Sequence, residues 1–128
     1  MRVINSDLGL VRDDAIDMSS AQTKNPSITS FADGSYVASY TVDNGGDTDI
    51  LARIVSTTGT VGSAITVRDN GPFTADFSQL ATLSNNTFVD VYQQLTYDHD
   101  IFFGIYTSAG TPLVVNSPVA GASSFGEE

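Results

Sequence analysis

The chain lacks cysteine and tryptophan, and its glutamates are confined to the last two positions, Glu127 and Glu128. Without cysteine it forms no disulfide, no thiolate metal site and no cysteine nucleophile. Because glutamate is absent from the rest of the chain, a glycosidase pair would need two aspartates. Tryptophan is the side chain that most often stacks on sugars, so its absence weakens the case for a carbohydrate-binding protein.

Basic residues and long apolar runs are also scarce. Five Lys and Arg stand against fifteen Asp and Glu, which gives the 128 residues a net charge of −10. A surface this acidic repels phosphate, so we expect neither nucleic acid nor an anionic membrane as a partner. No apolar run reaches the roughly 18 residues needed for membrane insertion, and residues 1–5 lack the apolar stretch of a signal peptide. The chain therefore fits a cytosolic protein, an excised fragment or a processed mature form.

The sequence patterns of known catalytic sites are missing as well. The chain has no nucleophile elbow, no P-loop, no dinucleotide-binding glycine pattern and no zinc-binding pattern. Its one histidine, His99, lies between Asp98 and Asp100 without a nucleophile or a further ligand beside it. We therefore predict that the protein is not an enzyme. An enzyme of an unrecognised type would gather these three residues in a polar cleft with residues from another part of the chain.

What the sequence does contain is an internal repeat. Residues 28–40 align with residues 80–92 at an offset of 52, and most paired positions are identical or similar. Residues 47–60 align with residues 98–111 at an offset of 51, and six of these fourteen pairs are identical. A one-residue deletion in the intervening loop reconciles the two offsets.

The repeat predicts one all-β domain over residues 1–128. Two repeats of about 51 residues occupy 26–70 and 77–120, and residues 1–25 supply an extra strand and a loop. Each repeat is expected to form four short antiparallel strands. In the first repeat we predict these strands near residues 27–31, 36–42, 49–56 and 64–68.

Turn signals separate the predicted strands. Asp-Gly at 33–34 and Asn-Asn at 85–86 both tolerate the positive φ that a tight hairpin turn needs. The last turn of each repeat is expected at 58–59 and at 109–110, where glycine is the second residue. Helical periodicity is weak, and only residues 13–20 are expected to form a short helical turn.

The third strand of each repeat is apolar on both faces. In the first repeat, one face carries Ile50, Ala52 and Ile54 and the other carries Leu51 and Val55. The second repeat places Ile101, Phe103 and Ile105 on one face and Phe102 and Tyr106 on the other. A strand of this kind is covered on both faces. We therefore predict blade-like sheets stacked as in a propeller, with a β-sandwich as the alternative.

Two blades do not close a propeller, because known rings need about four to eight. The chain would then be a fragment of a longer array, or it would assemble with its own copies into a ring or a head-to-tail filament. Residues 2–6 resemble residues 113–117, the predicted last strand of the second repeat. We expect this extra strand to complete a sheet in a neighbouring copy, so that deletion of residues 1–6 abolishes assembly.

Two stretches carry a resemblance to a known family: PSITSFADGSYVASY at 26–40 and DILARIVSTTGTVG at 49–62. They resemble the tandem propeller-like repeats of very large bacterial secreted and cell-surface proteins, which often lie beside haemolysin-type calcium-binding segments. The similarity covers residues 26–68 and 80–117, with tyrosine at the position where the family usually has tryptophan. It implies stacked blades, an extracellular or cell-surface location in a bacterium, and no catalysis.

The loop DNGGDTD is the most suggestive candidate site. Calcium prefers carboxylate and carbonyl oxygens on a flexible, glycine-containing turn, and Asp43, Asp47 and Asp49 would supply them. The spacing differs from that of an EF-hand, and the second repeat keeps only Asp98 and Asp100. The alternative is that the shared Asp-x-Asp pair caps a turn before the third strand.

Two other groups of residues are candidates for binding. Asp13, Asp14 and Asp17 form a second acidic cluster, which we interpret as a solvated loop or a helix N-terminus rather than a site. Four of the five tyrosines fall at strand positions that blade packing explains, which leaves Tyr97, in a loop, as the candidate for stacking on a sugar.

Together these patterns predict a non-enzymatic extracellular module with a structural or adhesive role. Its partners would be copies of itself or neighbouring repeats, and calcium would be its cofactor. The alternative is a small oligomeric lectin of propeller type, with glycans as partners.

Overall fold

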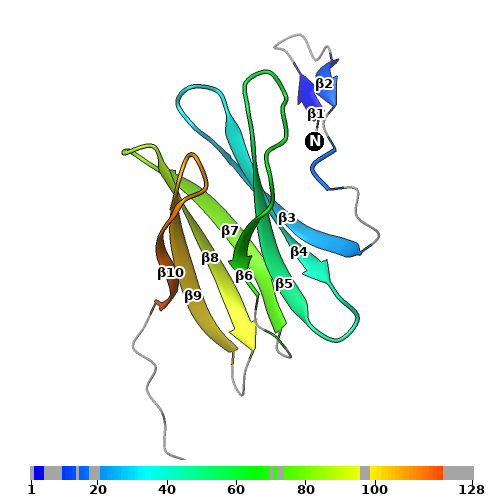
Figure 1. Ribbon diagram of the computed structural model, residues 1–128, viewed down its shortest axis with the longest axis vertical. Helices are drawn as coiled ribbons and strands as arrows, with labels where there is room; N and C mark the ends of the chain where they lie inside the picture. Colours follow the sequence, from blue (N-terminus) through cyan, green and yellow to red (C-terminus); the bar gives the residue numbers. More distant parts are fainter. Residues whose placement is uncertain are drawn as a thin grey trace, which may run out of the picture.

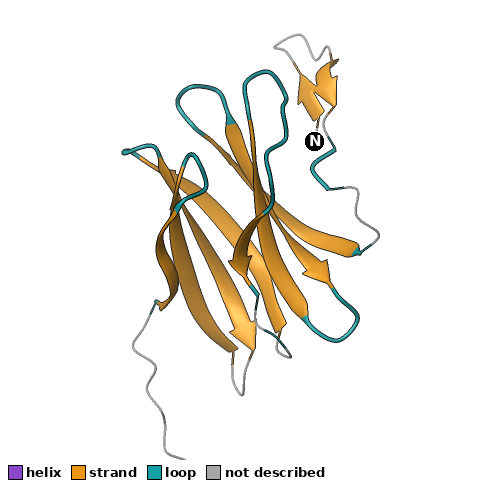
Figure 2. Ribbon diagram, in the orientation of Figure 1, coloured by secondary structure: helices purple, strands orange, loops and turns teal. Residues whose placement is uncertain are grey.

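The computed structural model describes residues 2–4, 10–13, 15–17, 21–69, 71, 74–95 and 99–119. Within these residues all regular secondary structure is β-strand, as predicted (Figure 2). The strands are β1 (Arg2–Ile4), β2 (Leu10–Asp13), β3 (Gln22–Ser30), β4 (Tyr36–Asp43), β5 (Thr48–Val55), β6 (Ile65–Arg68), β7 (Thr74–Leu83), β8 (Thr87–Leu95), β9 (His99–Thr107) and β10 (Pro112–Pro118).

Eight of these strands form one open mixed sheet (Figure 1). Its order is β10-β9-β8-β7-β5-β4-β3, and β6 pairs with β5 beside this path. The strands from β3 to β6, here called the first half, pair antiparallel in chain order. The strands from β7 to β10, the second half, do the same. A single parallel pair, Thr48 with Thr74, joins the two halves.

The strand and turn predictions for the first half hold closely. β4, β5 and β6 begin and end within one residue of the predicted ranges. β3 begins five residues earlier than predicted, because a β-bulge at Asn25 (φ 51°) carries the pairing past Pro26. A proline is tolerated at a bulge in an edge strand, where no ladder hydrogen bond is lost.

The predicted turns show the expected backbone geometry. Gly34 has a φ of 89° and Asn86 a φ of 61° in the two hairpin turns that join β3 to β4 and β7 to β8. Gly59 and Gly110 have φ values of 89° and 84° in the turns that follow β5 and β9. Positive φ is favourable for glycine and tolerated by asparagine, so these residue types hold the turns.

β7 crosses the face of the first half and so brings the two halves together. At one end the Leu80 N–H donates to Ser27 Oγ of β3, over 3.0 Å. At the other end Thr48 Oγ1 of β5 donates to the Ala75 carbonyl oxygen, over 2.9 Å. The strand therefore runs diagonally from β3 to β5, and the second half lies against the first.

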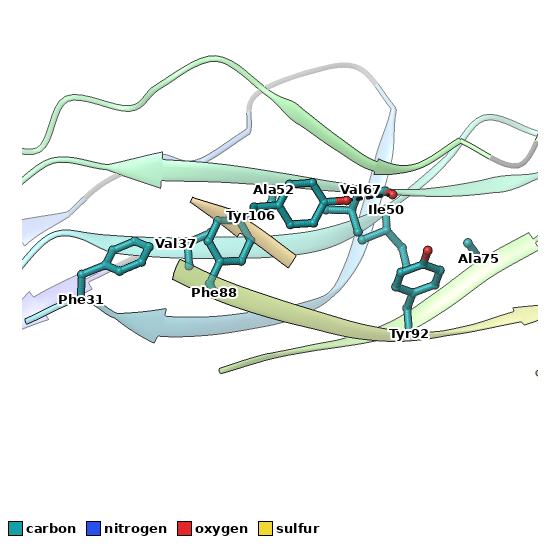
Figure 3. Close-up of a cluster of buried hydrophobic side chains, with 9 residues drawn as sticks. All are labelled: Phe31, Val37, Ile50, Ala52, Val67, Ala75, Phe88, Tyr92 and Tyr106. Atoms are coloured by element: carbon teal, nitrogen blue, oxygen red, sulfur yellow. Dashed lines mark hydrogen bonds between the residues drawn. The ribbon is translucent and has the colours of Figure 1, made fainter. Parts of the chain in front are cut away.

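The hydrophobic core lies between the two halves (Figure 3). Its buried members are Phe31, Val37, Ile50, Ala52, Val67, Ala75, Phe88, Tyr92 and Tyr106. The Phe88 ring stacks on Tyr106 with centroids 5.2 Å apart and meets the edge of Phe31 at 6.2 Å. Full burial of a side chain such as Val37 or Phe88 contributes about 1.5–3 kcal/mol, so this cluster is the main source of cohesion between the halves.

The N-terminal region differs from the prediction in two ways. β1 is not an unpaired strand, because it pairs antiparallel with β2 in a separate two-stranded sheet. The helical turn predicted at 13–20 is wrong for the residues that the structure describes there: Asp13 ends β2, and residues 15–17 are not helical. Residues 14 and 18–20 lie outside the described residues.

The expectation that both faces of the third strand are covered holds for β5 but not for β9. Ile50 and Ala52 on one face of β5 are fully buried, and Val55 on the other face is too. In β9, Tyr106 is buried but Ile101 is 46% exposed. The reason is positional, because the second half covers β5 whereas no other described strand lies over the Ile101 face of β9.

Candidate functional site

The acidic loop between β4 and β5 uses its carboxylates within its own turn. Asp43 Oδ1 accepts the Gly45 N–H at 2.9 Å, and Asp49 Oδ2 accepts Asn44 Nδ2 at 2.6 Å. The Asn44 N–H also donates to the Asp47 carbonyl oxygen at 3.1 Å. These bonds match the turn-capping alternative, in which aspartate side chains hold the backbone of a turn.

The corresponding residues of the second half do not add a described metal site. Asp98 lies outside the described residues, and Asp100 is exposed near the start of β9. In the described part of the chain, no three His, Asp or Glu side chains lie close enough together to hold a metal ion. Calcium binding by these loops therefore stays a prediction.

The remaining acidic and histidine candidates are dispersed. Asp17, from the N-terminal acidic cluster, interacts with the Tyr40 hydroxyl and so contacts the first half. Asp14 lies outside the described residues. His99 is exposed and lines a shallow depression with Asp76 and Gln93.

A polar network that the sequence analysis missed lies between the two halves. Ser39 Oγ of β4 and Ser78 Oγ of β7 are 2.5 Å apart, and Ser78 Oγ donates to Asp90 Oδ1 at 2.6 Å. All three residues are fully buried. Burial raises the pKa of Asp90 to about 7, although the Ser78 hydrogen bond lowers it in part. The sequence feature that could have indicated this network is an aspartate, Asp90, at a strand position whose side chain points to the interior, like those of Phe88 and Tyr92 in the same strand β8.

A second carboxylate, Asp76, joins three strands at the edge of the same interface. Its Oδ1 accepts Asn25 Nδ2 of β3 at 2.5 Å and Thr41 Oγ1 of β4 at 2.8 Å, while Lys24 lies 3.6 Å from Oδ2. Burial raises its pKa, but these hydrogen bonds, the Phe77 N–H and the Lys24 charge outweigh burial and lower the pKa overall. The arrangement holds the strands together and leaves the carboxylate ionised.

The described tyrosines serve packing. Tyr36, Tyr40, Tyr92 and Tyr106 are all buried. Burial raises the pKa of Tyr106 to about 12, and its hydroxyl donates to the Val67 carbonyl oxygen at 3.3 Å. Tyr97, the candidate for sugar stacking, lies outside the described residues. The described part of the chain therefore offers no exposed tyrosine to a sugar.

A further candidate surface is apolar and lies on the side of the second half that faces away from the first half. We call it the outer face and define it by Val89, Val91, Ile101, Phe103 and Ile105. The register pairs Val89 with Ile105 and Val91 with Phe103, so these side chains share one side of β8 and β9. Further exposed apolar side chains follow in and after β10, at Leu113 (57%), Val115 (60%) and Val119 (57%).

Comparison of the chain with protein-family models, with curated proteins and with solved structures gives no match. Among the residues that the structure describes, no helix has the length and apolar character of a membrane span. The geometry of the described residues is therefore the basis for any functional proposal.

Proposed function

We propose that the protein is a non-enzymatic structural or adhesive module that associates, through the faces of its sheets, with copies of itself or with neighbouring repeats. The observation that carries this proposal is the outer face. It is an apolar sheet surface whose counterpart in the first half is mostly buried, with Val37, Ile50 and Ala52 all 0% exposed. Ile101 on this surface is 46% exposed and the other four members are partly buried. An apolar patch left exposed on a folded protein marks a site of protein association.

The buried polar groups support a structural role over catalysis. Ser39, Ser78 and Asp90 bond to one another in the interior, and Asp76 bonds to strands β3 and β4. A catalytic group must reach a substrate, whereas Ser39, Ser78 and Asp90 are 0% exposed and join one strand to another. Their hydrogen bonds hold the two halves in register.

We also propose that the two halves are blade-like repeats in a propeller-like stack. Residues with positive φ recur at the spacing of the sequence repeat and support it. Asn25 and Phe77, both in bulges, are 52 positions apart, and Gly59 and Gly110 are 51 positions apart. The face-to-face packing of the two halves also fits the β-sandwich alternative.

The location follows from the family resemblance, and the cofactor follows from the aspartates of the DNGGDTD loop. We propose a bacterial extracellular or cell-surface setting, with calcium held by Asp43, Asp47 and Asp49 and by Asp98 and Asp100. In that setting the ion would replace or supplement the turn hydrogen bonds of these aspartates, and so stiffen the loops.

Mass in solution, measured by light scattering after size exclusion over a range of concentrations, tests this proposal. We expect species larger than the 13.5 kDa chain, and we expect millimolar calcium to favour them. Magnesium chloride at equal ionic strength is the control, since it screens charge equally but fits calcium sites poorly. In the Asp43→Asn and Asp49→Asn double variant, we expect the calcium effect to be lost.

A chain that stays monomeric at every concentration, with or without calcium, would contradict self-association. A glycan array tests the lectin alternative. Selective binding of defined glycans would replace the structural role by a carbohydrate-binding one.

A further inference from the structure

The outer face is open where the matching face of the first half is closed. Ile50 and Ile101 occupy equivalent positions in β5 and β9 by the sequence alignment. Ile50 is 0% exposed and Ile101 is 46% exposed. Val37 is likewise fully buried, whereas its counterpart Val89 is only partly buried. The chain thus contains its own example of how such a face is covered, namely by another four-stranded sheet.

The opposite end of the molecule is partly covered by its own chain. On the far face of the first half, Tyr36 and Tyr40 are 6% and 5% exposed. Asp17 lies against the Tyr40 hydroxyl, and residues Ala15 and Ile16 line a depression over the same strand. A head-to-tail filament needs two complementary open faces. The described residues offer one such face on the second half, whereas the far face of the first half is largely covered, with Ile28 exposed at its edge (51%).

Charge also favours contact through the outer face. The chain carries a net charge of −10, so two copies repel each other over most orientations. The five residues that define the outer face are uncharged, and β10 beside them contains no charged residue. A contact at these five residues therefore buries mainly apolar surface, with the exposed Asp100 beside Ile101 in β9 at its edge.

We propose that the outer face binds the outer face of a second copy, in a closed two-fold dimer. This inference rests on the self-association proposed above and names its surface and symmetry. Two sheets of β-branched and aromatic residues pack face to face at about 10 Å, with interdigitated side chains. A two-fold contact uses the same patch on both copies, so it covers both open faces and ends the assembly there.

The test compares Ile101→Asp with a matched control, Ile28→Asp. Ile28 is 51% exposed on β3, a similar exposure to that of Ile101, but it lies outside the outer face. We expect the wild-type chain and Ile28→Asp to have a mass of about 27 kDa, twice the 13.5 kDa of one chain. Ile101→Asp should have the mass of one chain. Ile101→Lys should dissociate too. Because Lys makes the net charge less negative whereas Asp makes it more negative, dissociation of both variants would be due to the charge buried at the contact and not to the net charge.

A second measurement avoids charged variants, because the chain has no cysteine of its own. Ile101→Cys and Ile28→Cys each introduce one thiol whose alkylation rate reports its accessibility. We expect alkylation of Ile101→Cys to slow several-fold as the protein is concentrated, and alkylation of Ile28→Cys to keep its rate.

The outcomes separate the two proposals. A wild-type chain that is monomeric throughout overturns both the dimer and the proposed self-association. If Ile101→Asp still assembles, and if the alkylation rate of Ile101→Cys does not change with concentration, the outer face is not the contact surface. Self-association itself would then still stand. Open-ended species that grow with concentration overturn the two-fold closure.

Discussion

Asp90 places a carboxyl group in the interior, where its charge is costly. The side chain is fully buried, one oxygen accepts a hydrogen bond from Ser78, and the other oxygen has no partner among the described residues. Desolvation of the ionised form raises the pKa of Asp90 to about 7. In the aligned position of the first half stands Ala38, so the charge is peculiar to the second half.

We expect the free energy of unfolding to fall by about 2–3 kcal/mol between pH 5 and pH 8 on account of Asp90. The raised pKa means that the folded chain holds the proton more tightly than the unfolded chain does. The stabilisation is therefore complete below the unfolded pKa of about 3.9 and is lost as the pH rises to about 7. Urea denaturation followed by circular dichroism measures this slope.

Two variants test whether Asp90 causes this pH dependence of the free energy of unfolding. Asp90→Asn cannot ionise, so it should remove most of the pH dependence. Asp76→Asn is the control, because the pKa of Asp76 is lowered and its carboxylate stays ionised throughout this pH range. A slope that survives in Asp90→Asn would contradict the assignment.

Gly104 is a second residue whose identity matters. A Cβ atom at Gly104 would lie 2.7 Å from a ring carbon of Tyr106, which is 1% exposed and cannot move aside. We expect Gly104→Ala to lower the free energy of unfolding by about 1–3 kcal/mol. Gly46→Ala is the control, since no atom lies within 4 Å of its added Cβ, and it should leave stability within about 0.5 kcal/mol. Equal effects of the two changes would contradict this packing argument.

At the scale of elements, the pairing of β1 with β2 alters an expectation about assembly. The backbone of β1 has a partner in its own chain, with Arg2 opposite Asp13 and Val3 opposite Arg12. The sequence alone suggested that this strand completes a sheet in a neighbouring copy.

We expect a chain without residues 1–6 to assemble with the same number of copies as the full chain, because the outer face lies on β8 and β9. Light scattering of the truncated chain beside the full chain measures this. Loss of assembly after the deletion would support the earlier expectation that β1 completes a sheet in a neighbouring copy, and it would contradict the two-fold contact.

At the scale of the whole molecule, the two halves form one body because β7 crosses the first half and their aromatic side chains interlock. The main hydrophobic cluster lies in this interface, while no strand in the described part of the chain covers the apolar outer face. Among the described residues, the molecule is thus largely covered at one end and carries an uncovered apolar sheet face at the other. This asymmetry is the basis of the proposed association.

Much of the fold was predictable from the sequence because its causes are local. Short runs of apolar and β-branched residues between turn signals marked β4 and β5 within one residue, and glycine or asparagine marked the turns at Gly34 and Asn86. These features depend on side-chain periodicity and on backbone φ preferences. The candidate calcium loop was located by its aspartates, but whether they cap a turn or bind an ion depends on geometry that composition does not determine.

The tertiary structure decided which surfaces meet. Ile50 and Ile101 read alike in sequence, yet one is in the core and the other borders solvent, because only one has another sheet packed over it. The Ser39–Ser78–Asp90 network joins residues far apart in sequence, so periodicity could not reveal it. Local sequence determined the strands and turns of this protein, whereas burial and the raised pKa of Asp90 arise from contacts between its halves.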